Sequence, residues 1–167
     1  MTVENISQMK PGVAMLYGPQ GSLKSSMAIT WPKNIVYFDF DLGHQRAWQI
    51  DGMINSGVVD IRKMPLPERS LTTRYTKLDG YLDMWKEFTE SIWSACEDPE
   101  VSTIIIDTLT NQWRLCCDAY LEEIQKVNPN RKQLLQIEYG EPNTRQRSLF
   151  DAIKTHNKWL VICMHET

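Results

Sequence analysis

The sequence lacks the features that mark secreted, membrane and strongly basic nucleic-acid-binding proteins. Its four cysteines form no C-x-x-C pair, and the adjacent Cys116 and Cys117 suit neither a zinc site nor an easy disulfide. The longest clean apolar run, 159–164, is far shorter than the ~20 residues of a membrane-spanning helix. The first residues carry no basic and apolar secretory signal. Eighteen Lys and Arg against 21 Asp and Glu give a net charge of −3. We therefore expect a reduced, cytoplasmic protein with no membrane partner.

The length and the hydrophobic pattern predict one layered domain. A chain of 167 residues with 42% hydrophobic and 23% charged residues is typical of a single globular domain, here 1–167. Apolar, strand-like runs alternate with segments of helical periodicity. Strands are predicted at 12–17, 34–40, 58–62, 101–107 and 159–164, and helices at 23–30, 78–96, 109–127 and 141–157. The alternation predicts an α/β fold with a parallel sheet.

A glycine-rich segment follows the first predicted strand. Its residues Gly18, Lys24 and Ser25 fit the phosphate-loop pattern G-x-x-x-x-G-K-[ST] at the correct spacing. Backbone N–H groups of such a loop form an anion site, Lys24 would reach the β- and γ-phosphates, and Ser25 would offer its hydroxyl to Mg²⁺. The predicted nucleotide-binding residues are Gly18, Pro19, Gln20, Gly21, Ser22, Leu23, Lys24, Ser25 and Ser26.

Leu23 departs from this pattern, because it occupies the position of the second glycine. If that position needs a positive φ, a leucine there costs about 1–2 kcal/mol. Gly21 would relieve part of that cost. The alternative reading of the segment is an ordinary strand–turn–helix connection capped by Ser22.

A carboxylate ends the strand predicted at 101–107. Asp107 would hold Mg²⁺ together with Ser25, directly or through water, since the acid of the second nucleotide-binding motif has this position. Functional sites of such sheets lie at the carboxyl ends of the strands, where both motifs would meet. The alternative is that Asp107 caps the helix beginning at Leu109.

Two further side chains follow predicted strands and complete the predicted catalytic set with Lys24. Asp41 lies beyond the strand 34–40 and would orient and deprotonate an attacking water. The alternative is that Asp39 and Asp41 are a pair of turn acids before Gly43. His165 follows the last strand and would sense the γ-phosphate if that strand lies beside the loop strand. The alternative for His165 is a position at a frayed chain end.

Taken in order, these motifs resemble those of a RecA-like P-loop ATPase domain. The likeness covers nearly the whole chain and is strongest to compact, phage-encoded nucleotide-binding proteins of the AAA-domain class that are related to RecA-type recombinases. The matching segments are 16–25, 39–43, 103–110, 139–147 and 161–166. The resemblance implies a three-layer core with a mostly parallel sheet, helices on both faces, and the last strand between the loop strand and the Asp107 strand. It places Asp41 where the family often has a glutamate, and His165 as the sensor.

The resemblance also implies a function. It predicts an ATP-binding and Mg²⁺-dependent ATPase that acts in phage or mobile-element DNA recombination or replication. Its partners would be single-stranded DNA, a recombination or replication protein, or further copies of the chain, with Arg145 and Arg147 as candidates to complete a neighbouring site. The chain ends just after a predicted core strand, which indicates a minimal or C-terminally truncated domain.

Other functions are compatible with the same motifs. Leu23 and Asp41 favour a nucleotide-dependent interaction or assembly module that does not hydrolyse ATP. A small-molecule kinase would need a lid, for which 63–77 is the candidate. The best candidates for contact with a phosphate backbone or another subunit are the basic residues Arg62, Lys63, Arg69, Arg74 and Lys77, for which a solvated loop is the alternative.

Overall fold

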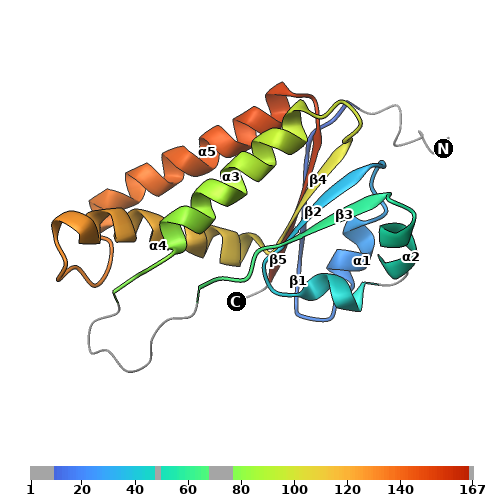
Figure 1. Cartoon of the computed structure of the whole chain (residues 1–167). Coiled ribbons are helices and arrows are strands. Elements are labelled where there is room, and N and C mark those ends of the chain that lie inside the picture. Colours follow the sequence, from blue (N-terminus) through green and yellow to red (C-terminus); the bar gives the residue numbers. More distant parts are fainter. Residues whose placement is uncertain (1–9, 48–49, 68–76, 166–167) are drawn as a thin grey trace.

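The centre of the molecule is a five-stranded sheet in which every pair of neighbouring strands is parallel (Figure 1). The computed structural model describes residues 10–47, 50–67 and 77–165. The strand order is β1-β5-β4-β2-β3. The strands are β1 (Val13–Gly18), β2 (Ile35–Asp39), β3 (Val59–Lys63), β4 (Thr103–Asp107) and β5 (Trp159–His165). The prediction of an α/β fold with a parallel sheet is confirmed.

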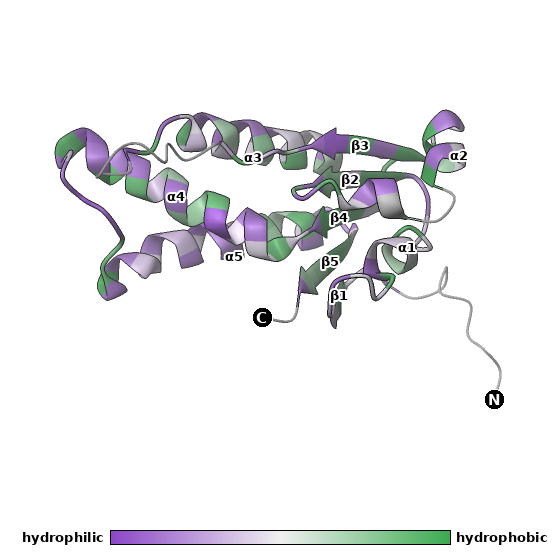
Figure 2. Cartoon of the chain, turned by 90° about the horizontal axis from the view of Figure 1, so that it is seen from below, coloured by the Kyte–Doolittle hydropathy of each residue, from purple (hydrophilic) through white to green (hydrophobic). Residues whose placement is uncertain are grey.

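Helices cover both faces of this sheet, which makes three layers (Figures 1 and 2). One face carries α3 (Tyr81–Glu97), α4 (Leu109–Val127) and α5 (Gly140–Thr155). The other carries α1 (Lys24–Ala28) and α2 (Ile50–Asn55). The described residues also form the 3-10 turns η2 (Gly43–Arg46) and η3 (Gln136–Tyr139). Within the described ranges, no helix combines the length and the hydrophobicity that a membrane span requires.

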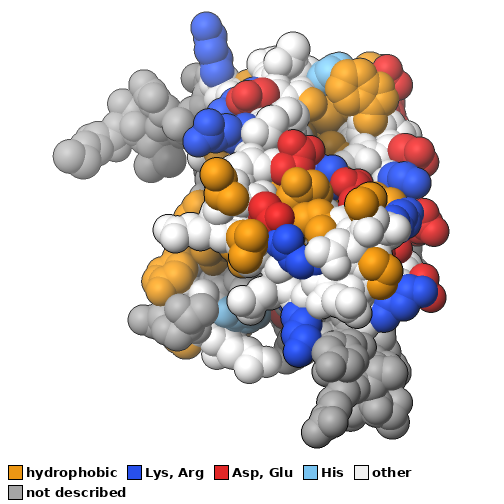
Figure 3. Space-filling model, turned by 90° about the vertical axis from the view of Figure 1, so that its left-hand side faces the viewer, with side chains coloured by type: hydrophobic (Ala, Val, Ile, Leu, Met, Phe, Trp, Pro, Cys, Tyr) orange, Lys and Arg blue, Asp and Glu red, His pale blue; other side chains and the backbone are white. Residues whose placement is uncertain are grey.

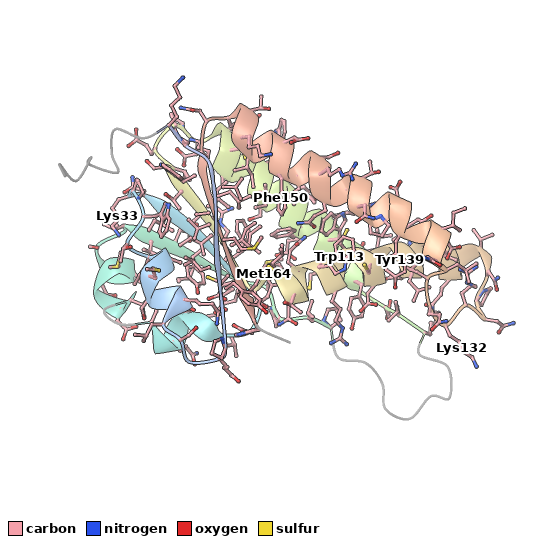
Figure 4. The ribbon with its side chains drawn as sticks, turned by 180° about the vertical axis from the view of Figure 1, so that it is seen from behind. Lys33, Trp113, Lys132, Tyr139, Phe150 and Met164 are labelled. Carbon is pink, nitrogen blue, oxygen red and sulfur yellow. The ribbon has the colours of Figure 1, made fainter. Side chains whose placement is uncertain are left out.

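The sheet separates two hydrophobic clusters. Side chains alternate between the faces of a strand, so Ile104 and Ile106 of β4 join the cluster under α3, α4 and α5, while Ile105 joins the cluster under α1 and α2. Phe150 of α5 and Met164 of β5, both labelled in Figure 4, pack against the larger cluster. Burial on both faces explains why β4 is a continuous apolar run.

The strand order brings the carboxyl ends of four neighbouring strands together. The strand β5 lies between β1 and β4, as the resemblance implied. Gly18 at the end of β1 pairs in register with His165 of β5, and Asp107 of β4 pairs with Asp39 of β2. Segments that are far apart in the sequence therefore place polar side chains at one edge of the sheet.

Candidate functional site

The loop between β1 and α1 folds around the ammonium group of Lys24. Its Nζ donates hydrogen bonds to the carbonyl oxygens of Gly18 (2.9 Å) and Pro19 (2.8 Å), and to Oγ of Ser22 (3.3 Å). The residue is only 8% exposed, and all three of these partners are uncharged. None of these oxygens is anionic, so an anion in the loop would be the first negative partner of this ammonium group and would be stabilised by it.

Leu23 adopts the left-handed conformation that a glycine would occupy in this loop. Its φ is 63° and its ψ is 19°, and Gly21 two residues earlier has a φ of 80°. Leu23 is the residue that precedes α1, and no side chain caps the helix, so the alternative in which Ser22 is the cap is wrong. The loop thus keeps a conformation that costs a non-glycine residue about 1–2 kcal/mol.

Asp107 connects the loop to the centre of the sheet. Its Oδ2 accepts a hydrogen bond from Oγ of Ser25 at 2.5 Å, across 82 positions in the sequence, and a second one from the hydroxyl of Tyr37. The cap of α4 is instead Thr108, whose side chain accepts from the backbone N–H of Asn111 at 3.4 Å. The alternative that Asp107 caps this helix is therefore wrong.

The electrostatic surroundings of Asp107 suit a cation. Burial raises the pKa of its carboxyl group; hydrogen bonds from Ser25 and Tyr37 lower the pKa, while the negative charges of Asp41 and Asp39 raise it further. Burial, reinforced by the charge of Asp107, also raises the pKa of Tyr37, so that this hydroxyl remains a donor. A divalent cation beside Asp107 would offset the burial and the like charges.

Asp41 lies between a turn and the end of β5. Its Oδ1 accepts a hydrogen bond from the backbone N–H of Gly43 at 2.9 Å, and its Oδ2 lies 3.2 Å from Nε2 of His165. Nδ1 of His165 is buried and has no hydrogen-bond partner among the described residues. Asp41 is therefore a turn acid, as the alternative reading held, and it also faces the histidine at the neighbouring strand end.

A second buried carboxylate fixes the turn that carries Asp41. Asp39 is 1% exposed, and its Oδ1 accepts hydrogen bonds from the N–H groups of Gly43 (3.0 Å) and Asp41 (3.4 Å). Its Oδ2 bonds to Nδ1 of His44. A Cβ atom at Gly43 would lie 2.8 Å from Oδ1 of Asp41 and 3.3 Å from Oδ2 of Asp107, so the absence of a side chain allows the carboxylates to approach.

Most of the predicted residues line one cavity of about 220 Å³ at this edge of the sheet. Its walls are residues 20–26 with Asp41, Gly43, Asp107 and His165. The predicted residues Gly18 and Pro19 take part by binding Lys24 through their carbonyl oxygens. The volume is below the roughly 300–1,000 Å³ of whole small-molecule sites, and it suits a phosphate chain better than a complete nucleotide.

The metal ligands available at this cavity are few. Across the described ranges, no group of three or more His, Cys, Asp or Glu side chains is placed to hold a metal ion. Mg²⁺ is commonly bound by one or two carboxylates together with water and substrate phosphates, rather than by a complete set of protein ligands. Ser25 and Asp107 fit that type of shared site.

Sequence reasoning missed four residues at this site: Tyr37, Asp39, Gly43 and His44. The segment that contains Asp39 and Gly43 was recognised as a motif, yet only Asp41 was assigned a role. A signal for the others was the clustering of two acids, a glycine and a histidine within six positions after a strand. Tyr37 carried no such signal, because an aromatic residue within a strand is usually core.

The two arginines that were predicted to complete a neighbouring site differ in their surroundings. Arg145 is bound within its own chain, since its guanidinium contacts Glu123 (2.8 Å) and Glu141 (2.9 Å) and lies over the ring of Tyr120. The expectation that Arg145 completes a neighbouring site conflicts with these contacts, whereas Arg147 is exposed.

The predicted basic contact residues are only partly described. Arg62 is bound to Asp60 and to the backbone oxygen of Ser91, while Arg69 and Arg74 lie outside the described residues, as does most of the lid candidate 63–77. On the face shown in Figure 3, basic and acidic side chains are interspersed. Interspersed charges of both signs are typical of an ordinary solvated surface rather than of a basic patch.

Comparison with protein-family models places the chain in a known family. A family model described as an AAA domain matches residues 10–167. No curated protein matches the chain at a significant level. The matched range includes every residue that the structure describes, and with it the loop, the strand ends and the cavity.

Proposed function

The chain belongs to the AAA domain family, and we propose that it binds ATP with Mg²⁺ in this cavity and hydrolyses the ATP. Membership of this family favours nucleotide binding and is compatible with ATPase activity. The observation that carries the proposal is the convergence of the Lys24 ammonium and the Ser25–Asp107 pair on one cavity. The positive group and the cation ligands of a phosphate site are thereby both present.

The residues fit ATP and Mg²⁺ for reasons that are local to the chain. Lys24, whose ammonium is held by neutral oxygens, would exchange some of these contacts for phosphate oxygens. Ser25 can offer an oxygen lone pair to a cation while its hydroxyl hydrogen stays donated to Oδ2 of Asp107. When bound, Mg²⁺ supplies positive charge to the phosphate oxygens.

Asp41 is the proposed general base. Its carboxylate would orient a water molecule and accept its proton, and His165, 3.2 Å away, would hold that carboxylate at the end of β5. The turn closed by Asp39 and Gly43 limits the movement of Asp41. The catalytic roles of Lys24, Asp41 and His165 are thus part of the proposal.

A second candidate function is supported by the contacts of Asp41. Both of its carboxylate oxygens are already engaged, one by Gly43 and one by His165, so each keeps about one lone-pair position for a water. The strained, left-handed conformation of Leu23 in the loop also favours binding of the nucleotide without its hydrolysis. A nucleotide-dependent interaction or assembly module would bind MgATP and show negligible turnover.

We place this activity in DNA recombination or replication of a phage or mobile element. The proposed compartment is the cytoplasm, and residues 1–167 would form one nucleotide-binding domain. Single-stranded DNA, a replication or recombination protein, and further copies of the chain are the proposed partners. The support for this setting is the likeness in motif order. Phosphate release that increases on addition of single-stranded DNA would strengthen it, and an unchanged rate would remove DNA from the proposal.

The first test is the substitution Lys24→Ala. Calorimetry with MgATP should detect binding to the wild type and none to the variant, because the variant lacks the only cation within the loop (residues 18–26). Phosphate release measured on the same samples separates the two candidate functions. Turnover supports the ATPase, and binding without turnover supports the module.

The matched control is Lys86→Ala, which removes an ammonium group from an exposed position of α3. Its ATP affinity should equal that of the wild type. Thermal melting of both variants shows whether the fold is retained. Unchanged affinity in a folded Lys24→Ala protein would contradict the proposed nucleotide site.

A further inference from the structure

Tyr37 is a buried strand residue whose hydroxyl reaches the candidate site. It lies in the middle of β2, is fully buried, and belongs to the hydrophobic cluster between the sheet and the helices α1 and α2. A buried tyrosine hydroxyl usually finds a partner, and here that partner is Oδ2 of Asp107, 70 positions away in the sequence. The single polar atom of this side chain is thus directed at the proposed cation site.

Alternation along the strands explains how Tyr37 reaches this carboxylate. Asp39 and Asp107 are in register, and Tyr37 precedes Asp39 by two positions, so that all three point to the face covered by α1. The phenol ring spans the distance from the strand interior to the strand end. Tyr37 therefore contacts Asp107 from within the sheet, whereas Ser25 contacts it from the start of α1.

The two hydroxyl donors occupy one oxygen of the carboxylate. A carboxylate oxygen offers about two lone-pair positions, and Oδ2 of Asp107 accepts from both Ser25 and Tyr37. The oxygen Oδ1 is the one that remains for a cation or its bound water. Ser25 is itself a proposed cation ligand and lies in the first turn of the short helix α1, while Tyr37 is fixed by the packing of the core.

Resting on the proposed function, we propose that Tyr37 is a positioning residue for the cation site. Its hydroxyl holds Oδ2 of Asp107 and thereby presents Oδ1 to the cation, whether or not Ser25 keeps its own bond to the carboxylate. Residues that orient metal ligands in this way commonly change metal affinity by roughly 10–100-fold when they are replaced. Loss of the Tyr37 hydroxyl should weaken the binding of Mg²⁺ and leave the binding of the phosphate chain unchanged, because the phosphate-binding Lys24 is held by other groups.

The test is Tyr37→Phe, which removes the hydroxyl and keeps the ring in the core. ATP binding is measured by calorimetry over a series of Mg²⁺ concentrations, and also with excess chelator. The Mg²⁺ concentration for half-maximal tightening should rise by roughly 10-fold or more. The affinity for ATP without Mg²⁺ should equal that of the wild type.

The matched control is Tyr81→Phe. Tyr81 is also a buried tyrosine, 1% exposed, and its hydroxyl donates to the carbonyl oxygen of Pro67 at 2.8 Å, away from the cavity. This variant should keep the Mg²⁺ midpoint of the wild type. Thermal melting without nucleotide measures how much each hydroxyl contributes to the fold.

The outcomes separate this inference from the proposed function. If the wild type shows no Mg²⁺-dependent ATP binding, the proposed function fails, and the role of Tyr37 fails with it. If the wild type binds and Tyr37→Phe has the same Mg²⁺ midpoint, only the positioning role is overturned, and any loss of melting temperature in that variant is structural. A shifted midpoint with unchanged metal-free affinity supports the positioning role.

Discussion

The substitution Leu23→Gly should stabilise the protein without altering its fold. Leu23 is held at a φ of 63° and is 71% exposed, so its side chain contributes little to the core. Removing its Cβ relieves about 1–2 kcal/mol of left-handed strain. The greater flexibility of glycine in the unfolded chain lowers the free energy of unfolding by about 0.4–1 kcal/mol. The net gain is roughly 0.5–1 kcal/mol.

Thermal melting without nucleotide measures this gain. For a domain of this size, 1 kcal/mol corresponds to about 2–4 °C, so Leu23→Gly should raise the melting temperature by roughly 1–4 °C. The matched control is Leu23→Ala, which removes most of the exposed apolar surface and keeps the Cβ atom. That variant should melt close to the wild type.

The comparison of these two variants decides between two causes. If glycine and alanine raise the melting temperature equally, the gain comes from removing an exposed leucine and not from the backbone. If Leu23→Gly melts below Leu23→Ala, the left-handed conformation carries no significant strain in this loop. Either result would refute the argument from φ.

Two further predictions concern the carboxylates. Gly43→Ala places a Cβ atom 2.8 Å from Oδ1 of Asp41, so the Asp41 carboxylate must move away from it. A displacement of this proposed general base by about 1 Å should lower the rate of phosphate release by roughly 100-fold. Gly52→Ala, with no atom within 4 Å of its new Cβ, is the control and should keep the rate. Asp107→Asn should raise the melting temperature near pH 7 and abolish the tightening of ATP binding by Mg²⁺. Because burial raises the pKa of Asp107 in the folded state, its stabilising contribution is complete at low pH and is lost as the pH rises through that pKa. The variant should therefore match the wild type below about pH 4 and exceed it near neutrality, and the opposite trend would contradict this reasoning.

The elements that could be predicted are those whose burial imposes a strong pattern. The helix at 109–127 coincides with α4, and the strand at 101–107 contains β4, because both carry a clear apolar periodicity. The helix α2 was missed, since it is six residues long, includes a glycine and buries only Ile50 among its six residues. A helix of fewer than two turns with one buried side chain has no periodicity to detect.

The candidate site was predictable where a motif has a fixed spacing or ends a strand. Lys24, Ser25 and Asp107 meet because parallel strands direct their carboxyl ends to one edge of the sheet. The pairing of Asp39 with His44 was not recognisable in the same way, because either residue alone resembles a turn residue. Local sequence showed that the turn is polar but not which of its groups point inward.

Tyr37 shows what additional information the sequence would need. An aromatic residue two positions before a strand end is ordinary core, and the strand pattern assigns its face but not its neighbour. The contact with Asp107 depends on β2 lying next to β4 and on the register that pairs Asp39 with Asp107. A shift of that register by one residue would turn Tyr37 to the opposite face from Asp107. Strand order and register are properties of the whole sheet, so residues that act through another residue become visible only when the fold is known.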